Sequence, residues 1–75
     1  MIENIKKLFQ GTEDQPGVLD KTEFIIELSK HVPAKPNTIR QHWLSDYGLW
    51  SIPDRHQELV LKMLQKTINK QNTQK

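Results

Sequence analysis

Apolar residues recur along this chain at the three- and four-residue spacing of amphipathic helices, and no segment alternates at the two-residue spacing of a strand. The first apolar stripe spans residues 1–10 and predicts a short helix that Gly11 ends. The following segment, residues 10–17, combines turn-forming and acidic residues and contains no apolar side chain. It therefore predicts an exposed loop.

A second helix is predicted over residues 21–32. Asp20 stands three residues ahead of Glu23, the spacing at which a side chain accepts a hydrogen bond from a free amide at a helix start. Pro33 should end the helix, because proline lacks an amide hydrogen and disfavours helical geometry in the preceding residue. The predicted buried face consists of Phe24, Ile25, Leu28 and Val32.

A third helix is predicted from Pro36, which suits a first helical turn, to about Tyr47, with Gly48 closing it. Its predicted buried stripe is Ile39, Trp43 and Tyr47, with Leu44 at the edge.

A fourth helix should follow, with Ser51 or Ile52 as its cap and Pro53 just inside it. Its predicted core stripe is Leu59, Val60, Met63, Leu64 and Ile68. Residues 69–75 contain no apolar side chain, so we expect a disordered C-terminal tail. The sequence thus predicts a single all-α domain of four helices over residues 1–68.

The composition limits the classes of protein that this chain can represent. Its 75 residues include no cysteine, which excludes disulfides and thiolate metal sites. Hydrophobic residues make up 35% of the chain, so its core must be thin. No segment has the ~20 apolar residues of a membrane span, and residues 1–4 do not resemble a secretion signal. We therefore expect a cytoplasmic protein.

Charge is distributed unevenly along the chain. The formal net charge is +2, yet residues 1–29 carry a net charge of −3 and residues 30–75 carry +5. The positive part is the part that can attract a polyanion, although charges scattered over a solvated surface would give a similar count.

No catalytic, cofactor or metal-binding motif is present in the sequence. His31, His42 and His56 fall on three different predicted helices, without the spacing of a zinc site. A glycine-rich phosphate loop and a serine nucleophile in a glycine turn are both missing. We therefore expect neither an enzyme nor a cofactor.

The segment from Leu28 to Arg40, LSKHVPAKPNTIR, resembles the helix-turn-helix signature of bacterial and phage regulators. Together with Trp43 and the segment IPDRHQ at residues 52–57, it is similar to the small repressor and Cro-like proteins of phages and mobile elements. The resemblance implies a helix-turn-helix core at about residues 21–47, a recognition helix that begins at Pro36, and a transcriptional regulator that binds double-stranded DNA.

Two residues depart from this family pattern. Pro33 stands where the family favours glycine, and it cannot adopt the positive φ that glycine allows. Lys35 stands where serine or threonine caps the recognition helix, which costs about 1 kcal/mol of capping but adds a cation near the expected phosphates.

The face of the third helix opposite its buried stripe is polar and lacks acidic residues. Rotation of ~100° per residue places Asn37, Thr38, Gln41, His42 and Ser45 there, with Arg40 on the flank. We expect base contacts from Asn37, Arg40, Gln41 and His42, phosphate contacts from Lys30, Lys35 and Arg55, and contacts of either kind from Thr38 and Ser45. An ordinary polar helix surface would have a similar composition, so that alternative stays open.

Two further residues raise the possibility of protein partners. Leu61 lies at the edge of the fourth apolar stripe and could extend it into a homodimer contact, although simple core packing is the alternative. Trp50 could be a lid on the core or an anchor for a partner. The second hypothesis for function is thus a small helical adaptor or inhibitor that binds a protein, such as a polymerase subunit, through Trp50 and Leu61.

Overall fold

Helices account for most of the described part of the protein, which comprises residues 1–44 and 50–73 of a computed structural model. In chain order they are α1 (Ile2–Gln10), α2 (Lys21–Ser29), α3 (Pro36–Thr38) continued by the π-helical turn η1 (Ile39–Trp43), and α4 (Asp54–Thr73). Within these ranges there is no strand, which confirms the predicted all-α domain of four helices. None of the described helices is both long and apolar enough to span a membrane.

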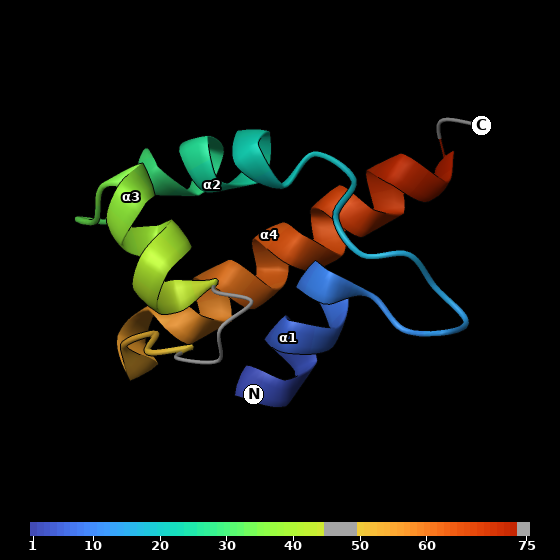
Figure 1. The fold of residues 1–75 in the computed structure, drawn as a ribbon, viewed down its shortest axis with the longest axis horizontal. Helices are drawn as coiled ribbons and strands as arrows, with labels where there is room; N and C mark the ends of the chain where they lie inside the picture. Colours follow the sequence, from blue (N-terminus) through green and yellow to red (C-terminus); the bar gives the residue numbers. More distant parts are fainter. Residues whose placement is uncertain (45–49, 74–75) are drawn as a thin grey trace.

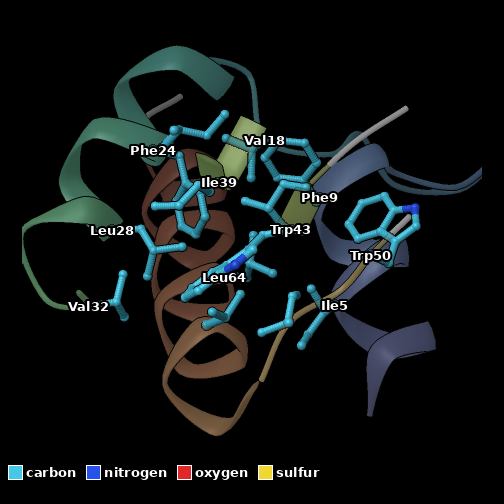
Figure 2. Close-up of a cluster of buried hydrophobic side chains, with 14 of the residues drawn as sticks. Ile5, Phe9, Val18, Phe24, Leu28, Val32, Ile39, Trp43, Trp50 and Leu64 are labelled. Atoms are coloured by element: carbon cyan, nitrogen blue, oxygen red, sulfur yellow. The ribbon is translucent and has the colours of Figure 1, made fainter. Parts of the chain in front are cut away.

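Helix α4 is the longest element, and the others pack around it (Figure 1). Helix α1 lies along α4, whereas α2 contacts α3 and η1. Their apolar faces meet in one core (Figure 2). The buried residues are Ile5, Phe9, Val18, Phe24, Ile25, Leu28, Val32, Ile39, Trp43, Leu44, Trp50, Ile52, Val60, Leu64 and Ile68.

Several predicted helix boundaries are confirmed. Gly11 follows α1 with a φ of 91°, a value that glycine adopts at little cost, and its amide donates to the Lys7 carbonyl at 2.8 Å. The Asp20 side chain caps α2 by accepting a hydrogen bond from the Glu23 amide at 3.0 Å. Pro36 is the first residue of α3, where its missing amide hydrogen has no cost.

Two predicted helices end earlier than expected. Helix α2 stops at Ser29 because the chain tightens there: the Lys30 and His31 amides donate to carbonyls only three residues back. The third helical segment ends at Trp43, since Leu44 has non-helical dihedrals of −120° and 69°. The remainder of that predicted helix, including Tyr47 and Gly48, lies outside the described residues.

The start of α4 differs from the prediction by one residue. The helix begins at Asp54, so Pro53 precedes it rather than lying inside it. Of the predicted core stripe, Val60, Leu64 and Ile68 are buried, whereas Leu59 and Met63 remain partly exposed.

The prediction of a disordered tail is wrong for residues 69–73, which continue α4. Gln71 supplies the physical reason. Its Oε1 accepts a hydrogen bond from the Leu19 amide at 2.8 Å, and its Nε2 donates to the Gly17 carbonyl at 3.2 Å. A polar side chain thereby fastens the end of α4 to a segment more than fifty residues earlier in the chain. The domain therefore extends beyond residue 68.

We expect Gln71→Ala to lower the free energy of unfolding by about 1–2 kcal/mol, because both hydrogen bonds are lost and two backbone groups lose their partners. Amide exchange near the end of α4 should become faster in the same variant. Urea denaturation and hydrogen exchange measure these effects. The matched control is Asn72→Ala, at an exposed neighbouring position. Equal stability of the two variants would show that the Gln71 contacts contribute nothing.

Candidate nucleic-acid interface

The α3–η1 segment carries most of the residues for which DNA contacts are predicted. It begins after Lys35, whose backbone is extended and whose side chain makes no cap hydrogen bond, as expected from the missing serine or threonine. Ile39 is fully buried and Trp43 is 6% exposed, so the segment is held by its inner face. This anchoring fixes which side chains point away from the domain.

The predicted DNA-contacting residues that the structure describes are all exposed. They are Lys30, Lys35, Asn37, Thr38, Arg40, Gln41, His42 and Arg55. The structure brings six of them together on the eight residues from 35 to 42, whereas Lys30 follows α2 and Arg55 lies on the first turn of α4. Ser45 lies outside the described residues.

The second half of the segment is a π turn, which the sequence did not indicate. The Leu44 amide donates to the Ile39 carbonyl at 2.8 Å, a step of five residues instead of the four of an α-helix. Each residue in such a turn rotates through less than the ~100° of an α-helix. Arg40, Gln41 and His42 are therefore spread over a narrower arc than regular helical spacing predicts.

No acidic side chain occurs between Leu28 and Leu44. The nearest one, Glu27, lies 3.3 Å from the Lys30 ammonium and 3.7 Å from the His31 ring nitrogen. The Lys30 and Glu27 side chains are more than half exposed, so their ion pair is worth little and does not prevent Lys30 from contacting an anion. Every charged side chain between Leu28 and Leu44 is therefore basic.

The first turn of α4 is attached to the end of η1 by an aromatic stack. The rings of Trp43 and His56 lie 5.6 Å apart at an angle of 24°. Next to this stack, the Arg55 Nε donates to the His56 Nε2 at 3.3 Å. The Ser51 amide also donates to the His42 carbonyl at 2.6 Å. Arg55 is thereby joined, through His56 and Trp43, to the segment that carries Arg40.

His56 is a supporting residue that sequence reasoning did not assign. Trp43 and His56 are separated by thirteen positions, so no helical spacing relates them. The prediction of a surface or partly packed histidine agrees with its intermediate burial. Among residues 1–44 and 50–73, no group of three or more histidine, cysteine or acidic side chains is placed to hold a metal ion.

The two residues considered for protein contacts lie in different environments. Trp50 is 6% exposed and packs edge-on against Phe9 with the ring centroids 6.2 Å apart (Figure 2). Leu61 is partly exposed and borders, with Leu8, a groove of about 350 Å³ between α1 and α4. Since Trp50 is covered, a partner on this side would contact mainly the Leu8 and Leu61 groove.

A scan against protein-family models, a search of curated proteins and a search of solved structures each found no match.

Proposed function

We propose that this protein is a sequence-specific transcriptional regulator that binds double-stranded DNA with a helix-turn-helix made of α2, residues 30–35 and α3–η1. In this proposal α3–η1 enters the major groove, and a homodimer on a palindromic site presents two such segments. No cofactor takes part in binding.

The observation that carries the proposal is the exposed, acid-free surface of residues 35–42 on a segment whose opposite side is buried. Asn37 and Gln41 have amides that pair with adenine, and Arg40 has a guanidinium that pairs with guanine. Lys30, Lys35 and Arg55 surround them with positive charge suited to phosphates. Ile39 and Trp43 are buried on the inner side of the segment, so these side chains are presented outward from a fixed support.

The proposal is tested by titrating a fluorescent random-sequence duplex with the protein at about 50 mM and about 200 mM salt. Three phosphate contacts, by Lys30, Lys35 and Arg55, predict a salt slope of about −2.7 and about a 40-fold loss of affinity between these conditions. A variant with all three residues changed to alanine should lose most of this slope.

The matched control changes Lys62, Lys66 and Lys70 to alanine, which removes the same charge from exposed positions of α4. It should retain the salt slope, because these residues lie outside the proposed surface. An equal loss of the salt slope in both variants would show that binding depends on net charge alone. The absence of binding at low salt would contradict the DNA proposal.

Arg40→Ala should weaken binding to a selected DNA site by about 1–3 kcal/mol and relax the preference at one base pair. Arg40 is exposed on η1, where its guanidinium can reach a base edge. Competition binding with single-base variants of the site measures both effects. A uniform loss over all sequences would assign Arg40 to a phosphate instead.

The second candidate is a helical adaptor or inhibitor that binds a protein, such as a polymerase subunit, in the Leu8 and Leu61 groove. A largely apolar contact there would depend weakly on salt, unlike DNA binding. The substitution Leu61→Asp should abolish such a complex and leave DNA affinity unchanged.

A further inference from the structure

A second, longer groove separates α2 from α4. One part, of about 580 Å³, lies between the start of α2 and the last turns of α4, and a second part of about 320 Å³ continues it toward His31. The two parts share Glu27, Met63 and Thr67, so they form one continuous depression. On α4 the groove extends from Leu59 to Gln71, which corresponds to about 18 Å of helix.

The floor of this groove is apolar and incompletely covered. Phe24 is 4% exposed, but Leu59 and Met63 are only partly buried, although the sequence predicts both in the core stripe of α4. At one end the Leu19 side chain is 74% exposed and adds a further apolar surface to the groove. The amide of the same residue is fixed by Gln71, so Leu19 is held at the rim.

The two walls of the groove have opposite charge. The wall formed by α2 and its cap carries Asp20, Glu23 and Glu27, and the α4 wall carries Lys66 and Lys70. No ion pair joins the two walls among the residues that the structure describes. The ion pairs of Glu27 are with Lys30 and His31, on its own side of the groove. Each wall therefore still presents charge to a molecule bound between them.

We propose that the α2–α4 groove binds an amphipathic helix of another protein, of about three turns, with a row of apolar side chains between one basic and one acidic edge. Leucine-sized side chains would cover Phe24, Leu59 and Met63. The basic edge would face Glu23 and Glu27, and the acidic edge would face Lys66 and Lys70. A convex helix fills a depression of this shape.

A second copy of the chain that docked through the same surface would place one depression over another. Such a contact leaves empty space over both floors, and interfaces require close packing. None of the residues that line the groove is among those proposed to contact DNA, although Glu27 at its edge pairs with Lys30. The proposal therefore stands whether or not the protein binds DNA.

The test uses three synthetic helical peptides with the same apolar row and with edges that are both acidic, both basic, or one of each. Fluorescence anisotropy with the full chain measures their affinities. The peptide with mixed edges should bind about tenfold more tightly than the other two, because only it places an opposite charge against both walls. In amide NMR spectra, the shifts caused by this peptide should centre on Glu23, Phe24 and Met63.

The variant Lys66→Glu/Lys70→Glu makes both walls acidic and should transfer the preference to the peptide with two basic edges. The matched control is Lys62→Glu, on the same helix but outside the groove, which should keep the preference for mixed edges. Failure of all three peptides to bind, equal binding of all three, or an unchanged preference in the double variant would overturn the proposal. Self-association that Glu23→Lys abolishes in analytical ultracentrifugation would also overturn it, in favour of a second copy in the groove.

Discussion

Replacing Ile39 by alanine should lower the free energy of unfolding by about 2–5 kcal/mol, the range for truncating a fully buried aliphatic side chain. Ile39 is 0% exposed, stands at the junction of α3 and η1, and accepts the π-turn hydrogen bond from Leu44. Its side chain anchors the segment from Lys35 to His42 to the core. In a domain of 75 residues this loss is comparable with the whole stability, so a large unfolded fraction is expected.

Urea denaturation followed by circular dichroism measures the effect of Ile39→Ala. The matched control is Thr38→Ala, at the adjacent exposed position, which should change stability by no more than about 0.5 kcal/mol. Ile39→Val removes a single methylene group and should cost about 0.5–1.5 kcal/mol, so the folded variant can also be tested for DNA binding. Equal effects of Ile39→Ala and Thr38→Ala would contradict the burial that positions α3–η1.

The second large effect is expected from Gly17→Ala. A Cβ atom at residue 17 would meet the carbonyl oxygen of Phe9 and backbone atoms of Gln10 and Gly11 at distances that real structures do not show. These are backbone atoms, so relief requires the loop to open. The hydrogen bond from the Val18 amide to the Phe9 carbonyl, at 3.0 Å, would then be strained or lost.

We expect Gly17→Ala to cost about 3 kcal/mol, at the upper end of the effects of overpacking, and to lower the Tm by about 12 °C or more. Thermal unfolding followed by circular dichroism measures this shift. Thr12→Ala, at an exposed position in the same loop, is the control and should leave the Tm nearly unchanged. A small shift for Gly17→Ala would mean that the loop does not close as tightly as the structure shows.

The local signals in the sequence were reliable where they depended on near neighbours. The cap at Asp20, the stop at Gly11 and the start at Pro36 depend on hydrogen bonds or dihedral angles within a few residues, so the sequence predicts them correctly. The buried positions Phe24, Leu28 and Ile39 follow from helical spacing alone.

The errors occurred where distant residues decide the structure. The last turns of α4 look like a disordered tail because they have no apolar side chains, but Gln71 binds backbone groups of Gly17 and Leu19. Leu59 and Met63 fit the core stripe by spacing, yet they are only partly buried: they pack against the core and also line the α2–α4 groove. Periodicity predicts which face of a helix is apolar, but it contains no information on whether another element packs there.

The candidate DNA surface shows the same division. The sequence by itself determined an all-α domain, the order of its helices, and a polar, acid-free segment from Lys35 to His42, because these features follow from residue type and local spacing. Only the tertiary structure decided the π turn at η1, the stacking of His56 on Trp43 beside Arg55, and the opening between α2 and α4. The stacking and the opening depend on contacts between elements far apart in the chain, and packing between such elements determines which side chains come together in space.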